Sequence, residues 1–218
     1  MSNLRGTVRL TGVALRAMLV LTLVLGVGYT LVVTGIGQLA LPWQSNGSLV
    51  DAKDRPVGGW TGGDAPVGSA LIGQSFSDAD GNALPQYFQP RPSAAGEKGY
   101  DPTSSGGSNL GPNNPDLTDA IAERRAAIAA REHVAESAVP ADAVTASGSG
   151  LDPQISPAYA LLQVDRVAAA RGVDPSALRK LVESKIQTRD AGYLGEPRVN
   201  VLELNLALDD GALGTASR

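Results

Sequence analysis

The sequence predicts an α+β protein in which a single N-terminal transmembrane helix precedes an extracytoplasmic domain, a small sheet packed with helices. Three observations lead to this class: an uncharged apolar run at residues 17–41, helical apolar patterns after residue 114, and an alternating apolar pattern at residues 198–209. Hydrophobic residues make up 43% of the 218 residues, which is enough for a packed core.

The composition excludes several classes of function. The chain has no cysteine, so disulfides, thiol catalysis and cysteine-based zinc sites are all excluded. Its formal net charge is -4 and its basic residues are scattered, so it lacks the basic stripe that nucleic-acid binding requires. The single histidine, His133, cannot form a multi-histidine metal site and is expected to be a solvated residue near a helix end.

The apolar run at residues 17–41, AMLVLTLVLGVGYTLVVTGIGQLAL, contains about the 20 apolar residues that cross a bilayer as a helix. A secretory signal peptide is the alternative, but the exit lacks a small-x-small cleavage site, which favours a retained anchor. Arg5, Arg9 and Arg16 precede the run, and no basic residue follows it until Lys53. The positive-inside rule therefore places residues 1–16 in the cytoplasm of a cell-membrane protein and everything after the span outside.

Within this span, Gly26, Thr30 and Thr34 recur every fourth residue, which places them on one face of a helix. Small residues in this spacing allow another helix to approach closely, so the face is a candidate partner interface. A plain lipid-facing anchor remains the alternative, because glycine is common in transmembrane helices.

The outer part is expected to begin with a Gly- and Pro-rich tether at residues 42–67, followed by a domain at 68–209 and a tail at 210–218. Residues 68–76 read as a strand, and residues 85–94 as an extended stretch punctuated by prolines.

Three helices are predicted from cap-and-proline pairs at Asn114-Pro115, Ser156-Pro157 and Asp174-Pro175. Gly172 is expected to close the second of them. Near the C-terminus, RVNVLELNLALD at residues 198–209 alternates apolar and polar residues, which predicts a half-buried strand.

The run TSSGGSNLGPNNP at residues 103–115 is nearly devoid of apolar side chains. Gly106, Gly107 and Gly111 could expose backbone amides as an anion nest, or could serve backbone angles with positive φ. The run lacks the Lys-Ser/Thr pair that completes a phosphate-binding P-loop, so a structural loop is favoured.

No catalytic residue and no metal ligand is predicted. The hydroxyls of VTASGSG at residues 144–150 have no histidine base nearby in the sequence, and Asp78 and Asp80 lie in a turn that lacks the closing Glu of a calcium loop. Arg91 is flanked by two prolines, so its stiffened backbone either presents the guanidinium to a partner or supports an internal ion pair.

Five segments in order after the span resemble the KdpC subunit family of the bacterial potassium-transporting P-type ATPase: GSALIGQSF, YFQPRPSA, YDPTSSGGSNLGPNNPDL, VTASGSGLDPQISPAYALLQVDRVAAARG and GEPRVNVLELNLALD. The resemblance implies a non-catalytic subunit of an ATP-driven potassium uptake complex. Its implied partners are a channel-like potassium-translocating subunit, an ATP-hydrolysing subunit, a small hydrophobic subunit and membrane lipid.

The resemblance further implies a catalytic chaperone that raises the ATP affinity of the hydrolysing subunit. It implies nucleotide contacts at six positions: Ser105, Gly106, Gly107, Ser108, Asn109 and Gln163. The charge bias around the span argues against direct contact, because it places these residues on the side away from cytoplasmic ATP.

We therefore expect Gly107, Ser108 and Asn109 to dock on the outer face of the channel-like subunit, with Arg91 as a further candidate interface residue. A membrane-anchored extracellular enzyme and an anchored solute-binding receptor are the alternative classes.

Overall fold

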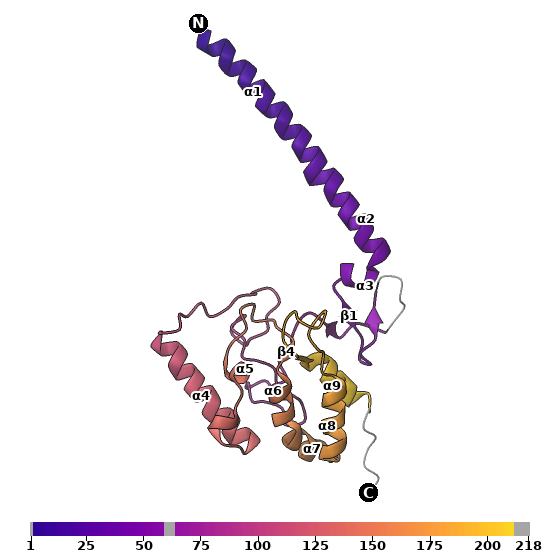
Figure 1. The fold of residues 1–218 in the computed structure, drawn as a ribbon, viewed down its shortest axis with the longest axis vertical. Helices are drawn as coiled ribbons and strands as arrows, with labels where there is room; N and C mark the ends of the chain where they lie inside the picture. Colours follow the sequence, from indigo (N-terminus) through magenta and orange to yellow (C-terminus); the bar gives the residue numbers. More distant parts are fainter. Residues whose placement is uncertain (1, 59–63, 212–218) are drawn as a thin grey trace.

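A long helical rod forms the N-terminal part of the protein (Figure 1). The computed structural model describes residues 2–58 and 64–211, with side chains from residue 6 onward. Three segments follow one another along the rod: α1 (Ser2–Leu21), η1 (Thr22–Tyr29) and α2 (Thr30–Ala40). Its stretch Gly6–Ala40 is long and apolar enough to cross a membrane, and its most apolar window is not buried against the rest of the protein. The predicted apolar helix is confirmed, and it begins before Ala17.

The middle of the rod, η1, is a π-helix, which the sequence analysis did not anticipate. Its hydrogen bonds span five residues rather than four, so the turn is wider than in an α-helix. Gly26 and Gly28 lie within it, and glycine is a weak α-helix former. The candidate helix face thus crosses a widened turn, because Gly26 lies inside η1 and Thr30 begins α2.

The segment expected to be a tether, residues 42–67, contains secondary structure. It holds α3 (Pro42–Ser45), β1 (Leu49–Val50) and β2 (Pro56–Val57). β1 pairs antiparallel with both β2 and β3 (Gly68–Ser69) in a three-stranded sheet. The Trp43 indole donates to the Leu49 carbonyl at 2.7 Å, which fastens the end of the rod to this sheet.

The strand predicted for residues 68–76 is shortened to β3, since only Gly68 and Ser69 pair with a neighbour. The Ser69 hydroxyl accepts a hydrogen bond from the Leu71 amide at 3.1 Å and so turns the chain away from the sheet. Such local side-chain bonds compete with strand pairing.

Three predicted helix starts are confirmed, because each cap side chain accepts a bond from a helix amide. The helices they begin are α4 (Pro115–Glu132), α6 (Pro157–Leu162) and α8 (Pro175–Ser184). The second predicted helix is interrupted at Gln163 and continues as α7 (Val164–Arg171), which Gly172 closes at φ 65°. His133 ends α4 in an exposed left-handed conformation, in agreement with its predicted role. Two short helices follow α4: η2 (Glu136–Ala138) and α5 (Ala141–Val144).

The strand predicted at residues 198–209 is wrong. Only β5 (Val199–Asn200) is extended; it pairs with β4 (Gln154–Ile155), and α9 (Val201–Asp209) follows directly. The Asn200 side chain caps α9 by accepting the Leu202 and Glu203 amides. In a helix, leucines at alternate positions form two pairs with i, i+4 spacing. Leu204 and Leu208 pack in the main core, whereas Leu202 and Leu206 pack in a second apolar cluster around Val50.

The α+β class is confirmed, with two small sheets in place of the single one expected. The main core gathers residues of α4 to α9 and of the segment around Phe88, which belongs to no helix or strand. In Figure 1, α4 lies on one side of the domain and α8 and α9 lie on the other. Its largest fully buried side chains include Tyr159, Phe88, Leu178 and Leu204.

Candidate functional site

The loop at residues 103–115 lies against a second loop rich in small residues, Ser147–Leu151. The Gly106 amide donates to the Ser149 carbonyl at 2.8 Å, and the Ser105 hydroxyl donates to the same carbonyl at 3.0 Å. The second loop is braced internally by a hydrogen bond between the Ser147 and Ser149 hydroxyls at 3.0 Å. The two small-residue motifs therefore form one paired-loop surface.

In the first loop, Gly107 lies close against the second loop, and Gly150 of the second loop lies close against the first. A Cβ at residue 107 would lie 3.0 Å from the carbonyl oxygen of Gly148, tighter than ordinary contact, whereas a Cβ at Gly106 or Gly111 would meet open space. None of the three has positive φ; that conformation falls on Asn109, at φ 55°. The close approach of the two loop backbones at Gly107 therefore explains the glycine there, whereas a left-handed backbone explains none of the three glycines.

The tip of the first loop, Ser108 and Asn109, faces solvent. Within the described part of the chain, neither side chain makes a hydrogen bond, so their polar groups are available to a ligand or partner. The loop then enters α4, where Asn114 accepts the Asp116 amide at 2.8 Å.

Gln163, the other nucleotide contact implied by the resemblance, is completely buried. Its Oε1 accepts the Gln89 amide at 2.7 Å, and its Nε2 donates to the Gln89 carbonyl at 3.1 Å. Arg166 donates to the same Oε1 at 2.7 Å. Among the described residues, the Gln163 side chain makes no hydrogen bond to the paired loops. Its amide group is already hydrogen-bonded to Gln89 and Arg166.

Asn205 makes the equivalent pair of hydrogen bonds to the backbone of Phe88, the residue before Gln89. Its Oδ1 accepts the Phe88 amide at 2.9 Å, and its Nδ2 donates to the Phe88 carbonyl at 3.0 Å. Residues 88 and 89 belong to no helix or strand. Two side-chain amides, from α9 and from the α6–α7 junction, therefore satisfy backbone groups that a sheet would otherwise satisfy. We call Gln163 and Asn205 the amide clamp.

A buried ion-pair network adjoins the clamp, and the sequence analysis missed it. Glu132, whose side chain is 0% exposed, accepts Arg166 Nε at 3.0 Å and Arg131 Nε at 2.8 Å. Arg131 also donates to the Tyr159 hydroxyl at 3.2 Å. Burial lowers the pKa of Arg166 and raises the pKa of the Tyr159 hydroxyl. Only the folded chain brings these residues together, since no local motif marks them.

Arg91 forms an internal ion pair, one of the two alternatives left open by its sequence context. Its Nη1 lies 3.0 Å from the Asp152 carboxylate, and its Nε and Nη2 donate to the Thr145 carbonyl at 3.4 and 3.3 Å. The guanidinium thus ties the proline-rich segment to the loop after α5.

No cluster of three or more metal-ligating side chains occurs in the described ranges, 2–58 and 64–211. In the described ranges, one exposed apolar helix of membrane length precedes an α+β domain, which suggests the class of membrane-anchored proteins.

Comparison with known proteins specifies the family within this class. Residues 11–210 match the family model "KdpC: K+-transporting ATPase, c chain". Three relatives named "Potassium-transporting ATPase KdpC subunit" come from Beijerinckia indica, Geobacter sulfurreducens and Kineococcus radiotolerans. They are 49%, 47% and 50% identical to this chain over 88%, 90% and 89% of its length and 89%, 95% and 90% of theirs. The chain belongs to the KdpC family, subunits of a K+-transporting ATPase.

Proposed function

We propose that this chain is a non-catalytic subunit that stabilises the assembly of a channel-like potassium-translocating subunit with an ATP-hydrolysing subunit. The observation that carries the proposal is the apolar rod, which is exposed along its length and makes no contact that buries its most apolar window. In a membrane complex, the face with Gly26, Thr30 and Thr34 would receive a partner helix, because small residues permit close packing. The small hydrophobic subunit is a further helical partner implied by the family.

The paired loops supply a second contact, on the outer face of the channel-like subunit. Gly107 holds the loop against Gly148, and the exposed Ser108 and Asn109 would donate and accept hydrogen bonds across the interface. A preshaped loop loses little conformational entropy on docking, which suits a permanent contact.

We expect Gly107→Val to reduce recovery of the channel-like subunit with this chain to about a tenth, since a loss of about 1.4 kcal/mol weakens binding tenfold. The added side chain would push the loop away from Gly148. Co-purification from membranes measures the effect, and circular dichroism checks that the variant is folded.

Gly111→Val is the matched control, because a Cβ there meets open space. Equal losses from both variants would mean that the pairing of the loops is not what the partner recognises.

The proposed orientation has the N-terminus in the cytoplasm and the domain outside the cell membrane. Arg9 and Arg16 on the rod support it, as does Arg5 in the sequence, whose side chain lies outside the described part of the structure. ATP affinity of the hydrolysing subunit would then be raised indirectly, by favouring one conformation of the complex.

A single cysteine tests the orientation directly, because the chain contains none. Ala79→Cys places a thiol on an exposed turn, and we expect it to react with a membrane-impermeant maleimide in intact cells. Labelling that requires cell lysis would contradict the orientation.

A further inference from the structure

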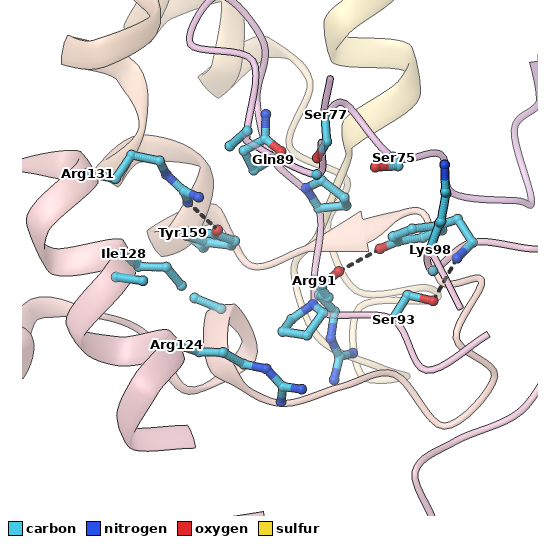
Figure 2. A pocket seen from close by; sticks show the side chains of 18 of the residues that line it. Ser75, Ser77, Gln89, Arg91, Ser93, Lys98, Arg124, Ile128, Arg131 and Tyr159 are labelled. Carbon is cyan, nitrogen blue, oxygen red and sulfur yellow. Dashed lines mark hydrogen bonds between the residues drawn. The ribbon is translucent and has the colours of Figure 1, made fainter. Parts of the chain in front are cut away.

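A cavity of about 430 Å³ opens between α4 and the segment 75–100 (Figure 2). Its volume is within the range of small-molecule sites, about 300–1,000 Å³. The proposed assembly role uses neither the cavity nor the α4 face that lines it. The paired loops dock elsewhere, since Gly107, Ser108 and Asn109 are not among its lining residues.

One face of α4 forms a wall of this cavity. Arg124, Ala127, Ile128 and Arg131 follow the i, i+3, i+4, i+7 spacing of residues on one side of a helix. Two guanidinium groups thus bracket a short apolar strip. Figure 2 shows Arg131 beside Tyr159, and Arg124 extending toward Arg91.

The cavity carries excess positive charge. Its lining has four cationic side chains and one carboxylate, that of Glu97; the cations are Arg91, Lys98, Arg124 and Arg131. Asp152 pairs with Arg91, and Glu132, which Arg166 shares, pairs with Arg131.

Arg124 is not neutralised. Its Nη1 donates to the Val144 carbonyl at 3.1 Å, and among the described residues no carboxylate lies within ion-pair distance. The neighbouring carbonyl, of Thr145, accepts from Arg91, so both guanidinium groups are bound to adjacent carbonyls of one segment, and Figure 2 shows them on the same side of the cavity. Among the described residues, Asp152 is the only carboxylate that pairs with either of the two guanidinium groups. An oxyanion would complete this arrangement, since guanidinium matches carboxylate and phosphate geometry.

Tyr159 adds a neutral donor to the cavity wall. Its side chain is 1% exposed, and its hydroxyl accepts from Arg131, which leaves its own proton for donation. A tyrosine hydroxyl is protonated at neutral pH, and burial raises the pKa of this one further.

We propose that this cavity binds a small organic oxyanion, a carboxylate or a phosphate ester, whose charged group lies on the Arg124 guanidinium beside Arg91. The apolar part of the ligand rests on Ala127 and Ile128. The site belongs to the outer domain itself and does not depend on assembly, so failure of the assembly role would leave it intact.

Calorimetry on the detergent-solubilised full chain tests the site with inorganic phosphate and succinate as separate probes, and with sodium chloride at matched ionic strength. We expect saturable binding of at least one oxyanion; the arm that binds identifies phosphate or carboxylate as the chemistry recognised. Arg124→Gln should weaken binding roughly 10-fold or more, because it removes the charge-assisted hydrogen bonds to the oxyanion. Arg125→Gln is the matched control, since Arg125 has the same charge on the next position but does not line the cavity.

A second pair of variants does not depend on the Arg124 contact. Ala127→Glu places a carboxylate on the exposed α4 face of the cavity and should abolish binding, whereas Ala126→Glu should not. The proposal is overturned if neither oxyanion binds saturably. It is also overturned if Arg124→Gln retains full affinity, or if the variants of each pair behave alike.

Discussion

Replacement of Glu132 by leucine is expected to lower the free energy of unfolding of the α+β domain by about 3–5 kcal/mol. The Glu132 side chain is 0% exposed and is the shared carboxylate of Arg131 and Arg166. Leucine would leave the Arg166 guanidinium, only 9% exposed, without its counter-ion in a site that excludes water. Urea unfolding of the full chain, followed by circular dichroism, measures the change.

Glu123→Leu provides the control, since Glu123 is on the same helix but exposed. Exposed substitutions usually change stability by less than about 0.5 kcal/mol. A Glu132→Leu effect no larger than that of the control would show that the buried network is not what fixes α4 against α7.

Replacement of Gln163 by methionine is the second large effect we expect. Methionine has similar volume but bonds to neither the amide nor the carbonyl of Gln89. Each buried backbone group left unsatisfied costs about 1–3 kcal/mol, so the midpoint of unfolding should shift strongly. Thermal unfolding measures the shift, with Gln154→Met as the control, because the Gln154 side chain is only half-buried and makes no hydrogen bond within the described chain.

This variant also separates two roles for Gln163. The amide clamp predicts that stability falls and that any change in ATP affinity of the complex follows from it. A nucleotide contact predicts the reverse: unchanged unfolding and a specific loss of ATP affinity. The second result would contradict the structural role.

Sequence reasoning succeeded where the signal is local. Asn114, Ser156 and Asp174 cap their helices as predicted, because a cap and the proline that follows it act within one turn. It failed at Leu202–Leu208, where alternate leucines fit a strand and also fit two interleaved pairs of helical neighbours. The Asn200 side chain caps α9 and so favours the helix, but Asn200 itself lies within the stretch that the pattern predicted to be a strand.

The sequence predicted only part of the candidate site, because most of its contacts join residues that are far apart in the chain. The loop at residues 103–115 could be recognised as a turn-rich run, but its partner loop is more than 40 positions away, with Ser105 bonded to Ser149. The amide clamp depends on still longer separations: 74 positions between Gln89 and Gln163, and 117 between Phe88 and Asn205. Such pairings arise from tertiary packing, which periodicity and caps do not report.

We propose that this chain is a permanent subunit held in its complex by the apolar rod. The most direct measurement is purification of the tagged full chain from membranes, with quantification of the channel-like and ATP-hydrolysing subunits. We predict that both co-purify in fixed proportion, that Gly26→Leu combined with Thr30→Leu releases them, and that apolar replacements at Val20 and Leu23 do not. Recovery of the wild-type chain without either subunit would contradict a role as a permanent subunit.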